Sequence, residues 1–263
     1  PAMSGSPVVA GVLTESELAR YSRQILLPDF DIAGQETLGR ACVLIVGLGG
    51  LGSPAALYLA AAGVGHLRLA DGDTVELSNL QRQIVHDEAS LGVNKARSAA
   101  QRLAALNSTT QLHVFEERLQ GRALAVAIAG ADLVVDASDS FATRYVLNRA
   151  CLEAGVPLLS AAAVRLEGQL ALFDTRSGGA CYRCLYPLAA ADDQRQACAE
   201  SGVLGPVVGI LGSLLALEAV KYLAGMQTLQ DEVLMLDLRT LAQYRLRLQR
   251  RPECSDCGSG AVP

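Results

Sequence analysis

A glycine-rich turn follows an apolar run near residue 46. The segment VLIVGLGGLG (43–52) contains Gly47, Gly49 and Gly52 in the spacing G-x-G-x-x-G. In such a turn the first glycine allows the bend, the second lets the backbone approach phosphates, and the third lets the next helix pack on the strand. Asp71 ends the next apolar run and can accept hydrogen bonds from ribose hydroxyls. The pattern predicts a nucleotide site; a tight turn without a ligand is the alternative.

Polar side chains after Asp71 favour a triphosphate over a dinucleotide. Asn79, Arg82 and Gln83 follow in one loop, and Lys95 stands at the start of a predicted helix. A triphosphate needs cations around it, whereas a nicotinamide dinucleotide requires little beyond the ribose acid. Arg82 or Lys95 alone is typical of a solvated surface. Together, beside a phosphate-binding turn, they favour an ATP site.

Two acids end a later apolar run, in the segment LVVDASDS. Asp136 and Asp139 stand at the carboxyl edge of the predicted sheet, where open α/β sheets bind ligands. A carboxylate there can hold Mg²⁺ on a triphosphate, because Mg²⁺ favours oxygen ligands. The alternative role is to cap the helix that begins at Phe141, which Asp139 or Ser140 could do. We expect one of the two acids to be such a cap.

Four of the seven cysteines form two CxxC pairs, Cys181 with Cys184 and Cys254 with Cys257. In a reducing compartment, such pairs are more often metal ligands than disulfides. Four thiolates suit a tetrahedral Zn²⁺ with no open coordination position. The alternative, a redox dithiol in one of the pairs, leaves the second pair unexplained.

The remaining cysteines differ in their surroundings. Cys42 and Cys151 stand on predicted apolar elements and are expected to be small core residues. Cys198 lies in the polar segment DDQRQACAESG with Arg195 nearby, where a thiol would be exposed and its thiolate favoured. Cys198 is therefore a candidate nucleophile, with a bystander role as the alternative.

Apolar runs and helical stretches alternate along the first half of the chain. Strands are predicted at 42–46, 67–70, 111–115, 133–135 and 157–163, and helices at 51–62, 96–106, 122–129 and 141–154. This alternation predicts a Rossmann-like, mostly parallel sheet with helices on both faces. Strands at 169–174, 232–238 and 244–248 then predict an antiparallel extension, with a polar segment at 189–202 and an apolar helix at 207–223 between the first two.

The preferred division of the chain is one domain after a short N-terminal segment. Residues 1–17 are expected to be flexible, and 18–263 to form a single domain. Within it, the nucleotide-binding part covers about 41–163 and the C-terminal extension with the cysteines about 164–258.

Composition excludes several classes of function. The 263 residues are 51% hydrophobic and carry a formal net charge of −5, with scattered basic residues. We therefore expect no nucleic-acid partner and no anionic membrane surface. The apolar stretch 203–217 is short for a membrane span and is predicted to be a buried helix. The first residues lack the pattern of a secretory signal, so we expect a cytoplasmic protein.

Five separated motifs resemble the ThiF/MoeB/HesA family, bacterial relatives of ubiquitin-activating enzymes. They are RYSRQILL (20–27), GLGGLGSPAALYLA, LSNLQRQI, CYRCLYP and GVLGPVVGILGSLLALEAVKYLAG, in this order over about 18–258. The resemblance implies an adenylyltransferase that binds MgATP and a small ubiquitin-fold sulfur carrier ending in Gly-Gly. The carrier carboxylate attacks the α-phosphate, giving an acyl adenylate and pyrophosphate, and a sulfur donor such as a cysteine desulfurase then leads to a thiocarboxylate. The pathway would be thiamine or molybdopterin biosynthesis, with the carrier ThiS-like or MoaD-like.

The resemblance also implies roles for single residues. It makes Gly50, Asp71, Asn79, Arg82 and Gln83 nucleotide contacts, pairs Lys95 with the phosphates and makes Asp139 the acid for magnesium and adenylation. It places Arg23 in the ATP site of a neighbouring subunit, which implies a homodimer. It also implies a structural zinc site. A cysteine at the position of Cys198 takes part in sulfur transfer in some members.

One motif departs from the family pattern. Where the family reads Cys-Thr-Asp-Asn, this chain has Ala137-Ser138-Asp139-Ser140. The acid is kept, but the local hydrogen bonding must differ. Gly50, the extra glycine of the turn, is expected to make room for the phosphate chain and the incoming carboxylate.

Two other classes of function remain as alternatives. An NAD-dependent oxidoreductase explains the glycine turn and Asp71, but it gives no role to Arg82, Lys95 or the four paired cysteines. A zinc-containing nucleotide-binding scaffold without activity needs none of Arg23, Arg82, Lys95 and Asp139, so it leaves the presence of these four residues unexplained.

Overall fold

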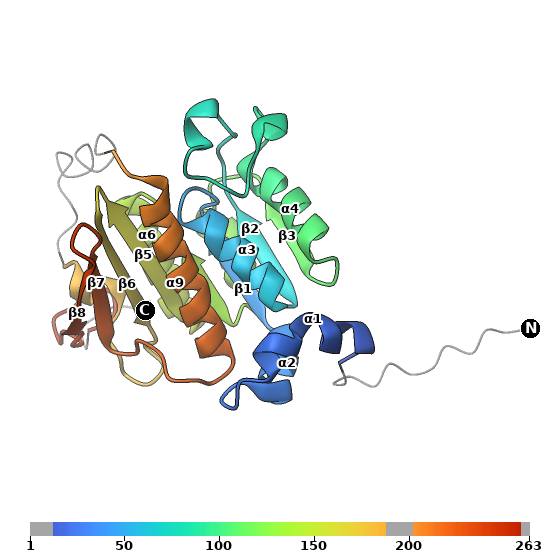
Figure 1. Ribbon diagram of the computed structural model, residues 1–263. Coiled ribbons are helices and arrows are strands. Elements are labelled where there is room, and N and C mark those ends of the chain that lie inside the picture. Colours follow the sequence, from blue (N-terminus) through green and yellow to red (C-terminus); the bar gives the residue numbers. More distant parts are fainter. Residues whose placement is uncertain (1–12, 188–201, 259–263) are drawn as a thin grey trace, which may run out of the picture.

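A single mixed sheet runs through the protein. The computed structural model describes residues 13–187 and 202–258, and within them an eight-stranded sheet has the order β3-β2-β1-β4-β5-β6-β7-β8 (Figure 1). The strands are β1 (Cys42–Val46), β2 (His66–Ala70), β3 (Gln111–Phe115), β4 (Leu133–Asp136), β5 (Leu158–Val164), β6 (Glu167–Phe173), β7 (Glu232–Asp237) and β8 (Ala242–Arg247). The helices are α1 (Glu15–Ile25), α2 (Asp31–Arg40), α3 (Gly52–Ala62), α4 (Lys95–Leu106), α5 (Gly121–Ile128), α6 (Phe141–Ala154), α7 (Tyr182–Leu185) and α9 (Gly205–Leu223).

The direction of the strands changes at β5. The strand pairs from β3 through β2, β1 and β4 to β5 are parallel. The pairs β5–β6, β6–β7 and β7–β8 are antiparallel. Connections through helices favour parallel pairs, and the direct connection from β5 to β6 favours an antiparallel pair. The predicted fold class, with its antiparallel extension, is confirmed.

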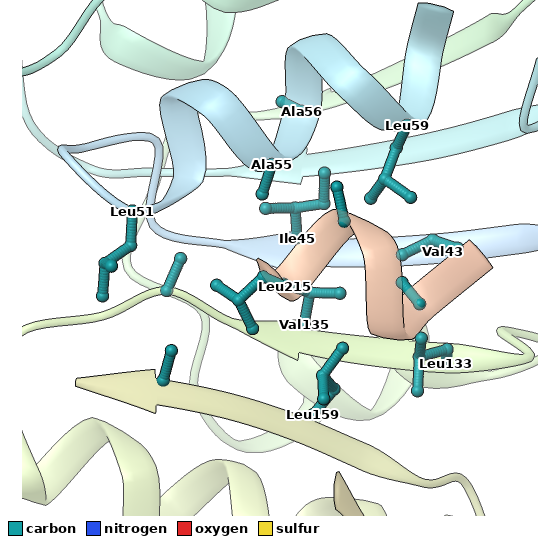
Figure 2. Packing of buried hydrophobic residues seen from close by; sticks show 14 of the residues in the cluster. Val43, Ile45, Leu51, Ala55, Ala56, Leu59, Leu133, Val135, Leu159 and Leu215 are labelled. Carbon is teal, nitrogen blue, oxygen red and sulfur yellow. The ribbon is translucent and has the colours of Figure 1, made fainter. Parts of the chain in front are cut away.

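Strand β1 is buried on both faces because its apolar residues alternate between two cores. Val43 and Ile45 belong to the core under α3 and α9, and Leu44 belongs to the core under α5 and α6. All three are fully buried. Figure 2 shows Val43 and Ile45 between α3 and the strand that carries Leu133 and Val135. A continuous apolar run is therefore the expected pattern for a central parallel strand.

Helix α9 crosses the front of the sheet beside α3 (Figure 1). It is long and apolar enough to span a membrane by length and composition. However, Leu211, Leu215 and Ala219 are almost or fully buried in the same core as β1. A Cβ on Gly212 would lie 2.4 Å from the Leu51 carbonyl oxygen, so glycine lets α9 approach the start of α3. The prediction of a buried core helix is confirmed.

Two helices precede β1 at the amino ends of the strands. Helix α1 begins at Glu15, where the side chains of Thr14 and Glu17 form a capping box. Buried Tyr21 anchors it, because the Tyr21 hydroxyl accepts a hydrogen bond of 2.9 Å from Asn107 Nδ2. Helix α1 therefore begins a few residues before position 18, and α2 has no counterpart among the predicted elements.

Candidate nucleotide site and cysteine cluster

The glycine turn joins β1 to α3 at the carboxyl edge of the sheet. Gly47 has φ +92°, a left-handed conformation that favours glycine. A Cβ on Gly52 would lie 1.9 Å from the Gly47 carbonyl oxygen, so α3 can begin this close to β1 only with glycine there. A Cβ on Gly49 would face Gln83 Nε2 at 3.4 Å. The turn is therefore compact and directly adjoins the loop that carries Gln83.

Gly50 has a different neighbour from the one expected. A Cβ at this position would lie 2.9 Å from Cγ2 of Val208, which is a buried residue of α9. The space that a side chain would need is occupied by α9, and this contact explains why the position requires a small residue. The assignment of Gly50 to the phosphate chain remains a prediction.

A cavity of about 520 Å³ lies beside the turn. It brings together side chains that are distant in sequence: Asn79, Arg82, Gln83, Lys95 and Asp139 all line it, together with Gly72, Asp73, Thr74 and Glu76. Five predicted site residues from three chain segments thus share one opening. Asp71 and the turn glycines do not line this cavity; Asp71 instead contacts the turn, where its Oδ2 accepts a hydrogen bond of 2.7 Å from the Leu48 N–H.

The two cations of the cavity are held by neighbouring groups. Lys95 is buried at the first position of α4, and its Nζ lies 3.5 Å from Asp73 Oδ2. Asp73 also accepts a hydrogen bond from Arg118, which holds the pKa of the Asp73 carboxyl below its ordinary value. Arg82 Nη1 donates to the Ser78 carbonyl oxygen at 3.0 Å. Two cations, Arg82 and Lys95, therefore share the cavity with three carboxylates, those of Asp73, Glu76 and Asp139.

The two acids after β4 have separate roles. Asp136 is fully buried and accepts hydrogen bonds from the Ser138 N–H at 3.0 Å, the Ser138 hydroxyl at 2.6 Å and the Ser160 hydroxyl at 2.6 Å. Asp139 is exposed and lines the cavity. Ser140 is the N-cap residue of α6 and makes no side-chain capping bond. The expectation that one of the acids caps this helix is wrong, because Asp136 instead bonds the loop and β5.

The structure shows the local hydrogen bonds at residues 137–140, where the chain departs from the family motif. Ser138 bonds back to Asp136, and its carbonyl oxygen accepts a hydrogen bond of 2.8 Å from Arg144 Nη2. Arg144 is buried on α6, and its Nε lies 3.7 Å from Asp136 Oδ2. A buried ion pair therefore fixes the residue that precedes Asp139.

One predicted site residue, Arg23, lies away from the cavity. Arg23 is exposed on α1 at the amino ends of the strands, opposite the cavity edge of the sheet (Figure 1). It therefore does not reach the cavity of its own chain in this structure. Cys198 lies outside the described residues.

The four paired cysteines form one buried cluster. Their Sγ atoms lie within 4.8 Å of one another, with Cys181–Cys254 at 3.7 Å, Cys184–Cys257 at 3.4 Å and Cys181–Cys184 at 3.9 Å. A Zn–S distance of about 2.3 Å in a tetrahedron corresponds to S–S edges of about 3.8 Å. Burial raises the pKa of the Cys181 and Cys257 thiols, so four adjacent thiolates require a compensating cation. The donor set fits Zn²⁺.

A scan against protein-family models matches the ThiF family over residues 21–256. The chain belongs to the ThiF family. It is 46% identical over 254 residues to the Escherichia coli sulfur carrier protein ThiS adenylyltransferase, covering 95% of this chain and 100% of that protein. It is 45% identical over 247 residues to the E. coli molybdopterin-synthase adenylyltransferase, covering 94% of this chain and 98% of that protein. A crystal structure of E. coli MccB with succinimide shares the fold, with a TM-score of 0.82, 24% identity and coverage of 96% of this chain and 77% of that chain.

In this member of the ThiF family, one asparagine joins the two cysteine pairs. Asn148 of α6 donates through Nδ2 to Asp256 at 2.9 Å and accepts at Oδ1 from the Tyr182 N–H at 2.8 Å. Asp256 also pairs with Arg183 Nε at 2.9 Å. Sequence reasoning missed these residues. Asp256 and Tyr182 could have been noticed because they stand inside the CxxC pairs, but Asn148 lies in an ordinary helical stretch.

Proposed function

We propose that this protein is an ATP-dependent adenylyltransferase whose acceptor is the C-terminal Gly-Gly carboxylate of a small ubiquitin-fold sulfur carrier. The observation that carries the proposal is the cavity where Arg82, Lys95 and Asp139 meet beside the glycine turn. The alternative of an NAD-dependent enzyme assigns no role to these two cations. The printed names of the two E. coli relatives, both adenylyltransferases, support the same reaction.

In the proposed reaction, a carboxylate oxygen of the carrier forms a bond to the α-phosphorus of ATP. The bond from that phosphorus to the bridging oxygen of pyrophosphate breaks, so the products are an acyl adenylate and pyrophosphate. Such a transfer requires positioning and charge neutralisation more than a protein nucleophile. Asp71 is assigned to the ribose, Asn79 and Gln83 to the nucleotide, and the N–H groups of the turn to the phosphates.

The cations would neutralise the phosphates. Lys95 would exchange its contact with Asp73 for a phosphate, and Asp73 would keep Arg118 as its partner. Arg82 faces the same cavity. Asp139, exposed at the cavity, would hold Mg²⁺, which when bound neutralises further charge on the triphosphate. The buried pair of Asp136 and Arg144 would keep the Asp139 loop in place.

The cysteine cluster is proposed to hold a structural Zn²⁺. With four protein ligands, such an ion has no open position for a substrate. It would join the segment near α7 to the C-terminal turn, and Asn148 would transmit that constraint to α6.

The proposed active form is a homodimer in which Arg23 of each subunit reaches the ATP site of its partner. Its exposure on α1, away from the cavity of its own chain, supports such a role. We expect Arg23→Ala and Asp139→Ala each to abolish adenylation. Mixing the two refolded variants should restore about a quarter of wild-type activity, because half of the dimers would be mixed and each would hold one complete site. Mixed dimers without activity would contradict this arrangement.

Later steps are proposed from the family resemblance. The terminal sulfur of a donor persulfide, such as that of a cysteine desulfurase, would attack the carrier carbonyl and displace AMP, giving an acyl disulfide. The Cys198 thiol would exchange into this disulfide and release the donor thiol, and a second thiol would then reduce the bond between Cys198 and the carrier to free the thiocarboxylate. Cys198→Ala should therefore leave adenylation intact and impair only sulfur transfer. The relatives for thiamine and molybdopterin pathways are equally similar to this chain, so identity does not choose between a ThiS-like and a MoaD-like carrier. A cytoplasmic location fits these pathways.

ATP–pyrophosphate exchange tests the proposed reaction. We expect exchange with a ThiS-like or a MoaD-like carrier, and none with a carrier that lacks its Gly-Gly end. Arg82→Ala should abolish exchange. Arg97→Ala is the matched control, since Arg97 is exposed on α4 and pairs with Glu116. Absence of exchange with either carrier, together with measurable NAD binding, would overturn the proposal.

A further inference from the structure

A buried histidine connects the parts of the nucleotide site. His86 is 7% exposed and lies in the loop between Asn79–Gln83 and α4. Its Nε2 lies 2.9 Å from the Leu48 carbonyl oxygen, and its Nδ1 lies 2.8 Å from the Ser98 hydroxyl. A carbonyl oxygen can only accept, so Nε2 carries the proton and Nδ1 accepts from Ser98. Burial lowers the pKa of His86, which favours this neutral form.

The bond to Leu48 acts on the centre of the glycine turn. Leu48 stands between Gly47 and Gly49, and its side chain is fully buried. Its N–H donates to Asp71 Oδ2 at 2.7 Å, and its carbonyl oxygen accepts from His86. Both peptide groups of this residue are therefore held. In a planar trans peptide, the C=O and the following N–H point in opposite directions. A hydrogen bond that fixes the Leu48 carbonyl therefore also fixes the direction of the Gly49 N–H.

His86 also contacts the two chain segments that carry Gln83 and Lys95, which line the cavity. Its backbone N–H donates to the Gln83 carbonyl oxygen at 3.1 Å. Its ring contacts Ser98, one turn after Lys95 on the same helix. The charged neighbours of the ring are Lys95, Asp71 and Asp87. One imidazole thus joins the turn, the segment 79–83 and α4.

We propose that His86 is a positioning residue that aims the N–H groups of the glycine turn at the phosphates of the nucleotide. The proposal rests on the proposed function, because it assumes that ATP binds at this turn. His86 does not line the cavity, and it acts through Leu48. Without its donor at Nε2, the Leu48 carbonyl oxygen would keep only the longer hydrogen bond of 3.4 Å from the Ser53 hydroxyl. The Leu48–Gly49 peptide would be held less firmly, and the phosphates would lose a preset donor.

A pair of amide variants separates the hydrogen bond from the packing of the ring. His86→Gln can place its amide nitrogen near the position of Nε2 and keep the donor to Leu48. His86→Asn is shorter and reaches only the position of Nδ1, near Ser98. Both remove the ring, so loss of packing is common to the two. Zinc content and far-UV circular dichroism would establish that each variant is folded.

The measurement is the affinity for ATP and for adenosine, obtained by titration calorimetry without a carrier. We expect His86→Asn to weaken ATP binding about tenfold, the usual effect of one lost hydrogen bond. Adenosine has no phosphates, so its affinity should change less than threefold. His86→Gln should bind ATP within about threefold of wild type. In carrier-dependent exchange, the KM for ATP should rise in His86→Asn more than kcat falls.

The outcomes distinguish the two proposals. Wild-type protein that binds no ATP would refute the proposed function. Wild-type protein that binds ATP, with equal ATP affinity in both amide variants, would refute the role of His86 alone. Equal losses for ATP and adenosine would indicate a general structural role and also refute it. If His86→Asn does not fold, Ser98→Ala decides, because it frees the ring from α4; an unchanged ratio of ATP to adenosine affinity would then overturn the inference.

Discussion

The contact between Gly50 and Val208 predicts a rescue between two distant positions. In Gly50→Ala, the new methyl group would lie 2.9 Å from Val208 Cγ2 and 3.2 Å from Val208 Cβ. The backbone at Gly50 is not left-handed, so the cost comes from this overlap. Overpacking of this kind costs about 1–3 kcal/mol. Val208→Ala removes two buried methyl groups at about 0.8 kcal/mol each. It thereby relieves the closest contact, at 2.9 Å, and leaves only the contact of 3.2 Å with Cβ.

The double variant should therefore be less destabilised than the sum of the single variants, by roughly 1–2 kcal/mol. Urea unfolding measures the free energies, and in a chain of this size each kcal/mol shifts the Tm by about 2–4 °C. We expect ATP affinity to follow the same pattern, with Gly50→Ala weakened and Gly50→Ala/Val208→Ala close to Val208→Ala alone.

The opposite result would refute this reasoning. If Gly50→Ala is as stable as wild type but no longer binds ATP, and Val208→Ala does not restore binding, the glycine is required for the approach of the phosphates. The expectation that Gly50 makes room for the nucleotide would then hold.

Four further predictions concern single residues. Asp139→Ala should abolish pyrophosphate exchange without changing the Tm or the zinc content, and near wild-type exchange would show that another group has its role. Arg144→Met leaves the Asp136 charge buried without its cationic partner, which should lower the free energy of unfolding by about 3–5 kcal/mol. A loss below about 1 kcal/mol in urea unfolding would contradict the ion pair. If the cysteine cluster holds Zn²⁺ as proposed, Cys184→Ser should contain less zinc than wild type and unfold at a lower temperature. Burial raises the pKa of Cys151 to about 12, so this thiol should resist alkylation in the native protein and react after unfolding. Peptide mass spectrometry would detect early labelling of Cys151.

The sheet could be predicted from the sequence because its signals are local. The central parallel strands β1, β4 and β5 are short apolar runs, and the outer strands β2 and β3 alternate polar and apolar residues. Each crossover between parallel strands contains a helix. Helix α2 was missed because its sequence, DIAGQETLGR, has no clear apolar face. Its buried Leu38 is one apolar position among polar and small residues.

The site could be predicted only in part, because some decisive contacts are long-range. Asp136 and Asp139 stand at the same strand end, and only the positions of Ser160 and Arg144 show which acid is buried. Gly50 and Val208 are far apart in sequence, so no pattern near the turn predicts the contact with α9. His86 and Asn148 belong to no motif, and their roles follow from partners in other elements.

The packing of α9 has a consequence for the modularity of this protein. Residues of α9 fill the same core as β1, and the helix reaches the glycine turn itself through Val208. The segment 41–163 is thus half of a structure whose interior is completed from the far end of the chain. A fragment that ended at residue 163 would expose the interior beneath α9 and leave β5 as a bare edge. We therefore expect that the segment 41–163 does not form a nucleotide site when it is inserted alone into another protein. An engineered chimaera would need α9 as well.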